Sequence, residues 1–217
     1  MKIEEIKEQC EKTIKTFPDK VLPIEYIDTG IMLREGFAFC SMAELFNVDY
    51  IIESGVRHGF STEIWAGFFP DKEIYAIDIG EYEKRAGFDL TRKRLEKHKN
   101  IHFVFGDSKN EIPKILQTNA GKTVGVCLDG PKDVVAINLA KTLFNDINCR
   151  FVGIHDQCHP DLYHTMASWD KSVWFTDDSW FVEKYSYIEC LEDYKHVSFK
   201  KDHFGGIGFA VNEDTNV

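Results

Sequence analysis

Apolar and polar residues alternate along this chain in blocks that predict strands followed by helices. An apolar run over residues 50–54 ends at a glycine turn, and apolar residues then recur with helical spacing up to residue 69. Further apolar runs predict strands at 73–77, 101–105, 123–128 and 151–154, with helical patterns between them. This alternation predicts an α/β fold, a doubly wound and mostly parallel sheet with helices on both faces and right-handed crossovers.

The residues before the first strand predict a helical extension. Apolar side chains fall on one helical face near the N-terminus, and Pro18 and Pro23 then break the pattern. That face consists of Ile3, Ile6, Cys10, Ile14 and Phe17. Ser41 to Glu44 has the form of a capping box, which predicts a short helix beginning there. We therefore divide the chain into an N-terminal helical extension, 1–47, and a main domain, 48–217.

The C-terminal third contains an aromatic segment and a predicted hairpin. Aromatic residues crowd positions 169–187. They either cover the sheet, form a dimer contact, or make a lid over an acceptor molecule. Residues 197–200 and 205–211 predict a hairpin that would add two final strands to the sheet.

Composition narrows the classes of partner. The chain has 217 residues and a net charge of −10, which argues against binding a nucleic-acid backbone. Small molecules or sugars fit this charge better. Nowhere do about 18 uninterrupted apolar residues predict a membrane span, and the N-terminus has no apolar leader segment. The six cysteines form no C-x-x-C pair, so a reducing cytoplasm is expected. Either a monomer or a homo-oligomer is compatible with the sequence.

The glycine turn after the first strand is the strongest sign of a ligand site. Gly55 and Gly59 lie four residues apart, and glycine lets the backbone approach a bound group closely. The following helix start offers unpaired N–H groups, and Ser61 or Thr62 can cap it or contact the same ligand. The turn lacks the G-x-G-x-x-G spacing of dinucleotide sites, so a nicotinamide-dependent oxidoreductase is a poor second interpretation.

Each of the five predicted strands brings an acidic residue to the same edge of the sheet, where ligands bind in such folds. These residues are Glu53, Asp78, Asp107, Asp129 and Asp156. Taken singly, Asp78 or Asp107 is as well explained as the N-cap of a helix. Five carboxylates on one rim repel one another, so we expect a cation or hydrogen-bond donors to compensate them.

Chemical uses can be assigned to these positions. Asp78 can accept both ribose hydroxyls of an adenosine, and Asp107 with Ser108 can reach the adenine edge. Asp129 and Asp156 could share Mg²⁺, to which Gln157 would add a neutral oxygen. A zinc site at His155, Cys158 and His159 is not favoured, because no second cysteine pair accompanies them.

At this point a family resemblance becomes specific. Residues 49–159 resemble the catechol O-methyltransferase type of class I S-adenosylmethionine (SAM)-dependent methyltransferases, which have a Rossmann-like, seven-stranded fold. The stretch 53–61 is similar to that family's E-x-G-x-x-x-G-Y-S, and 106–113 to its G-x-S-x-x-x-I-P. Residues 127–133 are similar to its L-D-x-x-K-D, and 154–157 stand where it has A-D-N.

The resemblance implies a set of site residues. SAM would contact Glu53, Gly55, Gly59, Ser61, Asp78, Asp107, Ser108 and Asp129. The metal ligands would be Asp129, Asp156 and Gln157, and the catalytic residues Lys132 and Asp129, with Lys132 taking the acceptor's proton. A lysine exposed at a helix start is the alternative interpretation of Lys132.

The sequence also departs from the catechol enzymes. Gln157 replaces Asn, Gly130 and Pro131 replace bulky side chains, and His155 precedes the second aspartate. Acid-rich strand ends also occur in the similar cephalosporin hydroxylase and sugar O-methyltransferase groups. We therefore expect SAM-dependent, Mg²⁺-assisted O-methylation of a small-molecule or sugar hydroxyl, with His155 as second-choice base. The alternative is a SAM-binding domain without catalysis.

Overall fold

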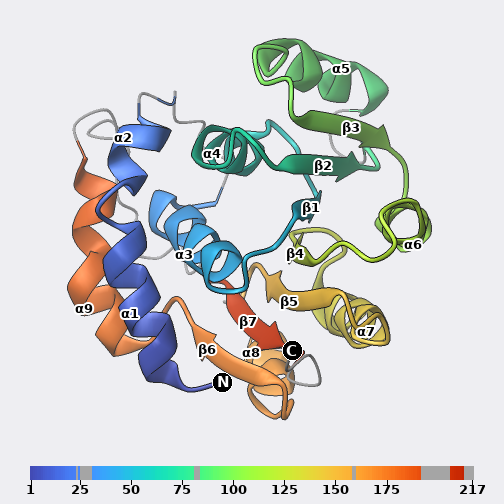
Figure 1. Ribbon diagram of the computed structural model, residues 1–217. Coiled ribbons are helices and arrows are strands. Elements are labelled where there is room, and N and C mark those ends of the chain that lie inside the picture. The colour runs from blue at the N-terminus through green and yellow to red at the C-terminus, as the bar shows by residue number, and fades with distance from the viewer. Residues whose placement is uncertain (23, 25–30, 81–83, 158–159, 192–205, 213–217) are drawn as a thin grey trace.

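A computed structural model describes the protein except for residues 23, 25–30, 81–83, 158–159, 192–205 and 213–217. Its strands form one sheet in the order β3-β2-β1-β4-β5-β7-β6 (Figure 1). The strands are β1 (Tyr50–Ser54), β2 (Glu73–Asp78), β3 (Ile101–Phe105), β4 (Val124–Leu128), β5 (Cys149–Ile154), β6 (Ser172–Phe175) and β7 (Gly208–Val211). The first five are parallel, and β7 runs antiparallel to both β5 and β6. The predicted α/β fold is confirmed.

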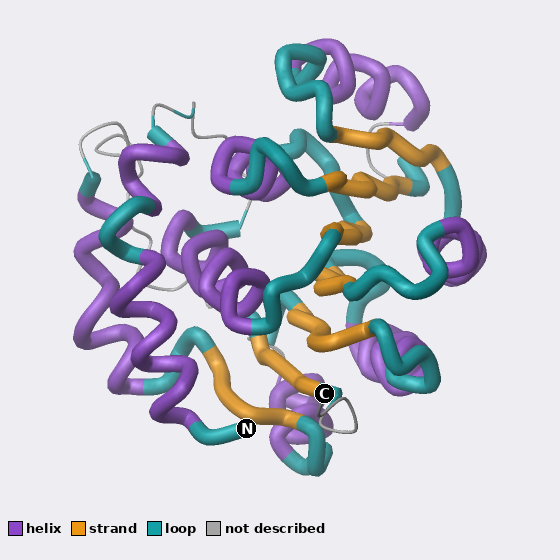
Figure 2. The backbone as a smooth tube through the Cα atoms, viewed as in Figure 1, coloured by secondary structure: helices purple, strands orange, loops and turns teal. Residues whose placement is uncertain are grey.

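Helices cover both faces of this sheet (Figures 1 and 2). On one side lie α1 (Ile3–Thr13), α2 (Phe17–Val21), α3 (Leu33–Leu45), α4 (Phe60–Phe68) and α9 (Ser179–Tyr185), with α1 packed on α3 and α2 on α4. The other side packs against α6 (Ser108–Thr118), α7 (Asp133–Leu143) and α8 (Pro160–Ala167). The helix α5 (Lys84–Arg94) lies beside β3, and a 3₁₀ turn, η1 (Ser186–Cys190), follows α9.

The central strands read as continuous apolar runs because both of their faces are covered. Every residue of β1 and β4 is buried, whereas the edge strand β3 is only partly buried. This is the pattern expected of parallel strands inside a doubly wound sheet.

The N-terminal region differs from the prediction in the additional helix α2 and in the start of α3. The predicted apolar face is confirmed in α1, while Pro18 lies in the first turn of a separate helix, α2. The predicted capping box at Ser41 is wrong, because Ser41 lies inside α3 and its hydroxyl donates to the Phe37 carbonyl at 3.0 Å. A serine bonded in this way continues a helix instead of starting one.

The N-terminal helices share one hydrophobic cluster with β1 and α4. The division into 1–47 and 48–217 stays a prediction.

The last two strands also differ from the predicted hairpin. β7 lies within the predicted 205–211 strand. Its two neighbours in the sheet are β5 and β6, and β6 comes from the aromatic segment. Residues 197–200 lie outside the described residues. Trp174 in β6 stacks on Phe209 with ring centroids 5.0 Å apart, and Phe181 stacks on Phe37 at 6.0 Å. These aromatic residues therefore cover the sheet as part of the core.

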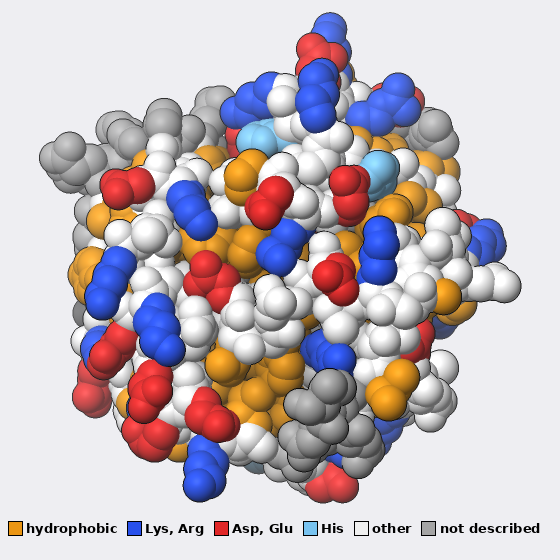
Figure 3. Space-filling model, in the orientation of Figure 1, with side chains coloured by type: hydrophobic (Ala, Val, Ile, Leu, Met, Phe, Trp, Pro, Cys, Tyr) orange, Lys and Arg blue, Asp and Glu red, His pale blue; other side chains and the backbone are white. Residues whose placement is uncertain are grey.

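Charged residues are mixed on the face of the molecule seen in Figure 3. Lysine and arginine alternate there with aspartate and glutamate, without a continuous basic patch. That arrangement agrees with the net charge of −10.

Candidate active site

The turn between β1 and α4 packs directly against the end of β4. Gly55 has φ +88°, and a Cβ there would lie 2.8 Å from the backbone of Asp129 and Gly130. The N–H groups of Asp129 and Gly130 both donate to the Ser54 carbonyl, at 2.9 and 3.1 Å. Only glycine fits such a close, left-handed position. The predicted glycine turn is thus held by its neighbouring strand.

Gly59 ends the turn and precedes α4 with φ +74°. A Cβ at this position would come within 2.8 Å of Leu95 and Thr91, beside α5. The two glycines therefore meet two separate neighbours: Gly55 lies against the end of β4, and Gly59 lies against Leu95 and Thr91.

Asp78 fixes the same turn from the end of β2. Its carboxylate accepts the Arg57 N–H at 2.7 Å and the Gly80 N–H at 2.6 Å. An ionised carboxylate has about four acceptor positions, and these two N–H groups of the described residues use two of them. The next side chain, Ile79, is 55% exposed and presents an apolar surface beside them.

Glu53 lies fully buried beneath the turn. The hydroxyls of Ser61 and Thr62 donate to its two carboxylate oxygens, so Ser61 serves Glu53 and does not cap α4. Burial raises the pKa of Glu53 to about 8, against the opposing effect of these two hydrogen bonds. The structure thus joins two predicted cofactor residues, Glu53 and Ser61, to each other.

Asp107 and Ser108 lie at the start of α6. Asp107 is the N-cap and accepts the Lys109 N–H at 2.9 Å, so the capping interpretation is confirmed for this residue. Ser108 is buried, and its hydroxyl lies 3.3 Å from the Gly130 carbonyl. Both residues stand at the predicted edge of the sheet.

The ends of β4 and β5 bring together Asp129, Lys132, His155 and Asp156. The Lys132 ammonium forms ion pairs with both aspartates. His155 Nδ1 lies 2.8 Å from Asp129 Oδ1 and 3.3 Å from Asp156 Oδ1. Two cationic or hydrogen-bonding groups therefore compensate the repulsion between the aspartates.

These contacts set the pKa values of the cluster. Burial acts to raise the pKa of Asp129, but His155 and Lys132 outweigh it and lower the pKa. Burial acts to lower the pKa of Lys132, but Asp129 and Asp156 outweigh it and raise the pKa. Burial also acts to lower the pKa of His155, but the carboxylates of Asp129 and Glu35 outweigh it and raise the pKa well above its ordinary value. The shift of Lys132 is opposite to that of a ready proton acceptor.

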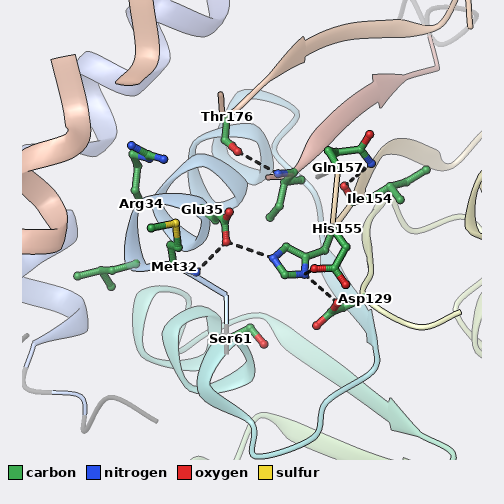
Figure 4. A network of polar contacts seen from close by, with 12 residues as sticks. Met32, Arg34, Glu35, Ser61, Asp129, Ile154, His155, Gln157 and Thr176 are labelled. Carbon is green, nitrogen blue, oxygen red and sulfur yellow. Dashed lines mark hydrogen bonds and ion pairs between the residues drawn. The ribbon is translucent and has the colours of Figure 1, made fainter. Parts of the chain in front are cut away.

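The predicted metal ligands are brought together only in part. Ligand atoms of Asp129, His155 and Asp156 all lie within 4.8 Å of one another. Gln157 donates its amide to the Ile154 carbonyl at 3.0 Å and points away from Asp129 (Figure 4). The third potential ligand beside the two aspartates is therefore a nitrogen of His155 and not the amide oxygen of Gln157.

Glu35 is a site residue that the sequence analysis missed. It lies in the first turn of α3, fully buried, with Oε2 3.3 Å from His155 Nε2 (Figure 4). The available signal was a charged pair, Arg34-Glu35, inside the otherwise apolar stretch 31–40. A charge in such a stretch is expected to be paired when it is buried.

Comparison with known proteins rests on solved structures, since no family model and no curated protein sequence matches the chain. TomG, an O-methyltransferase from Streptomyces achromogenes involved in tomaymycin synthesis and solved with SAM, matches with a TM-score of 0.53 and 16% identity. The match covers 94% of this chain and 89% of TomG. A Klebsiella pneumoniae protein assigned as an O-methyltransferase matches with a TM-score of 0.53 and 10% identity, over 94% of this chain and 90% of its own.

The SAH-bound Podospora anserina methyltransferase PaMTH1 matches at 20% identity with a TM-score of 0.45. That match covers 69% of this chain and 61% of PaMTH1, so the chain spans about three-fifths of that protein. Together with the strand order, the TomG and Klebsiella matches show that this chain has the Rossmann-like fold of SAM-dependent methyltransferases. Within the described residues, no helix is long and apolar enough to cross a membrane.

Proposed function

We propose that this protein is a SAM-dependent methyltransferase that acts on a hydroxyl group of a small molecule or sugar. The observation that carries the proposal is the turn 55–59, anchored by Asp78 on one side and packed against Asp129 on the other. The turn therefore lies beside a cluster of acids and bases at one edge of the sheet. The methyltransferase fold supports the same assignment.

The residues at the ends of β1 and β2 fit the adenosine part of SAM. Asp78 has acceptor positions beyond those used by the described N–H groups of Arg57 and Gly80, and these would take ribose hydroxyls. The exposed Ile79 offers an apolar surface to a flat base. Ser108 lies at the adjoining edge of the site.

The chain's own residues have a limited task in this chemistry. A bound sulfonium supplies both the methyl group and its leaving group, so the protein must align the acceptor oxygen and exclude water. Asp129 and His155 can orient the acceptor hydroxyl. Lys132, whose side chain is partly exposed, would first release to solvent the proton that its aspartate partners stabilise, and would then take the proton of the acceptor hydroxyl.

A divalent cation is part of the proposal. Asp129 and Asp156 offer carboxylate oxygens, which Mg²⁺ and Mn²⁺ prefer, and His155 offers a nitrogen that suits Mn²⁺ better than Mg²⁺. Such a cation would lower the pKa of an acceptor hydroxyl as a Lewis acid. We propose Mg²⁺ or Mn²⁺ as the metal.

We also propose a cytoplasmic enzyme whose partner is a small acceptor molecule, without nucleic acid or membrane, as a monomer or a homo-oligomer. Four cysteines of the described chain, Cys10, Cys40, Cys127 and Cys149, are free and buried, which suits a reducing compartment.

Calorimetric titration with SAM, S-adenosylhomocysteine and NAD tests this function. We expect binding of the first two and none of NAD. Asp78→Ala should weaken SAM binding at least ~10-fold, because it removes hydrogen bonds to a charged acceptor, each of ~1.5–3 kcal/mol. Asp71→Ala, which removes an exposed carboxylate near the opposite end of β2, should leave affinity unchanged.

Equal affinity of a folded Asp78→Ala variant and wild type would reject the assignment. A screen of hydroxyl-bearing sugars and aromatics for methyl uptake would follow. Binding of SAM without transfer to any acceptor would favour the binding-only alternative.

A further inference from the structure

Glu35 contributes a carboxylate to the site from α3, a helix on the face of the sheet opposite α6 and α7 (Figure 1). Its Oε2 accepts the Met32 N–H at 2.7 Å and lies 3.3 Å from His155 Nε2. Among the described residues, its other oxygen, Oε1, has no hydrogen-bond partner. Burying a carboxylate with half of its acceptor capacity unused is unfavourable, so packing alone does not explain this residue.

Capping of α3 explains only one contact of Glu35, the Met32 N–H that it accepts as the glutamate of a capping box. The carboxylate of Glu189, in η1, accepts the N–H groups of Leu33 and Arg34 at 3.2 and 2.7 Å. The first turn of α3 is therefore already bonded to a carboxylate, and Glu35 adds only the Met32 N–H. The contact of Glu35 with His155, in contrast, has no part in capping α3.

Glu35, His155 and Asp129 lie in a row, with the imidazole ring between the two carboxylates (Figure 4). Side-chain exposure rises from 0% at Glu35 through 10% at His155 and 21% at Asp129 to 42% at Lys132. Asp156, 29% exposed, lies beside the outer end. The His155 ring thus stands between a buried carboxylate and the two aspartates that face the proposed acceptor.

We propose that Glu35 is a positioning residue for methyl transfer, which holds the His155 ring so that Nδ1 faces Asp129 and Asp156. This inference rests on the proposed function. An imidazole can turn about its bond to Cβ, and a carboxylate bonded to one ring nitrogen fixes where the other nitrogen points. Because the Glu35 contact is buried, it is stronger than the same contact in water.

Two substitutions separate orientation from packing. Glu35→Met keeps similar length but removes the acceptor, so the ring loses its fixed orientation. We expect turnover on an acceptor found in the screen to fall ~10²-fold, the loss typical of a small misplacement of reacting groups, with SAM affinity unchanged. Glu35→Gln keeps an oxygen that accepts from His155, and should restore most of the turnover.

Glu189→Gln is the matched control. It alters another buried carboxylate at the start of α3, and the hydrogen bonds of Glu189 go to the α3 backbone rather than to His155. Its turnover per folded molecule should match wild type, even if its stability changes. Equal losses in Glu35→Met and Glu189→Gln would show that both act only through folding, and would overturn the proposal.

Nuclear magnetic resonance of the His155 ring supplies a readout that does not need methyl transfer. We expect a slowly exchanging Nε2–H signal, assigned by its absence in His155→Gln, that disappears in Glu35→Met and persists in Glu35→Gln. An unchanged signal in Glu35→Met would overturn the inference. Failure of wild type to bind SAM would reject the proposed function instead, a result that calorimetry separates from the ring signal.

Discussion

Glu53 is a carboxyl group that the fold removes completely from water. It is fully buried at the end of β1, and burial raises its pKa to about 8 from an ordinary value of 4.5. Near neutral pH it is therefore mainly protonated in the folded chain. A neutral Glu53 also reduces the repulsion from Asp78 and Asp129 at the same edge of the sheet.

The raised pKa of Glu53 predicts a pH-dependent stability. The folded state holds a proton that the unfolded state releases, so the stabilisation is complete below about pH 4.5 and is lost as pH rises towards 8. Wild type should lose stability between pH 5 and pH 8 relative to Glu53→Gln, which cannot ionise. The relative slope cannot exceed about 1.4 kcal/mol per pH unit. Urea unfolding of both proteins at several pH values measures it.

Glu63 offers a control of opposite sign. It is also buried, but Lys97 and Arg94 outweigh the burial and lower its pKa. Its stabilisation is therefore present above its ordinary pKa and is lost only as pH falls. Wild type should not lose stability relative to Glu63→Gln between pH 5 and pH 8. Parallel curves for wild type and Glu53→Gln would contradict the buried, protonated state of Glu53.

The sequence predicted the residues at the ends of strands better than the residues that reach the candidate site from a distant helix. Asp78, Asp129 and Asp156 could be placed at one edge of the sheet because parallel strands end there. Glu35 was missed because its contact with His155 joins positions 120 residues apart. The orientation of Gln157 was also beyond the sequence, since a local hydrogen bond to Ile154 decides it.

At the scale of elements, the β1–α4 turn depends on one backbone conformation. Gly55 combines a left-handed φ with a backbone contact to β4, whereas Gly121 has a similar φ of +86° and open space around it. The two glycines therefore separate the cost of the dihedral angle from the cost of the contact.

Alanine substitutions at the two glycines should differ clearly. Gly121→Ala should cost about 1–2 kcal/mol, the penalty of a left-handed residue with a Cβ. Gly55→Ala should cost an additional ~1–3 kcal/mol from overpacking, and should also weaken SAM binding because the turn must move. Denaturant unfolding and calorimetry measure both effects. Equal stability of the two variants would mean that the backbone at the end of β4 moves away from the added Cβ at little cost in free energy.

Regular elements were predictable where the apolar period was unambiguous. The strands β1 to β5 lie close to their predicted positions. The strand β6 was not predicted, because Trp174 and its aromatic neighbours also fit a lid or an interface. Only the antiparallel pairing with β7, across more than thirty residues of chain, decides between these interpretations.

At the scale of the whole molecule, the sheet order divides the proposed site into two halves. The ends of β1 and β2 carry the turn and Asp78, while the ends of β4 and β5 carry Lys132, His155 and the two aspartates. Since β1 and β4 are neighbours, the two halves meet where Gly55 packs on Asp129. Substitutions in the first half should therefore act on cofactor affinity, and substitutions in the second half on turnover.

Lys132 tests this division. Lys132→Met keeps the apolar stem but removes the amine, so SAM affinity should stay within a few-fold of wild type while turnover falls ~10²–10⁴-fold, as expected for loss of a general base. Lys132→Arg keeps a positive charge beside Asp129 and Asp156 but cannot release a proton, and should lose turnover as well. Calorimetry and methyl uptake by an acceptor from the screen measure the two quantities, with and without chelator and added Mg²⁺ or Mn²⁺. Loss of activity with chelator, restored by the metal, would support a cation between the aspartates. Turnover retained by Lys132→Arg but not by Lys132→Met would assign the lysine a purely electrostatic role, because only its charge would then matter, and His155 would become the base to test.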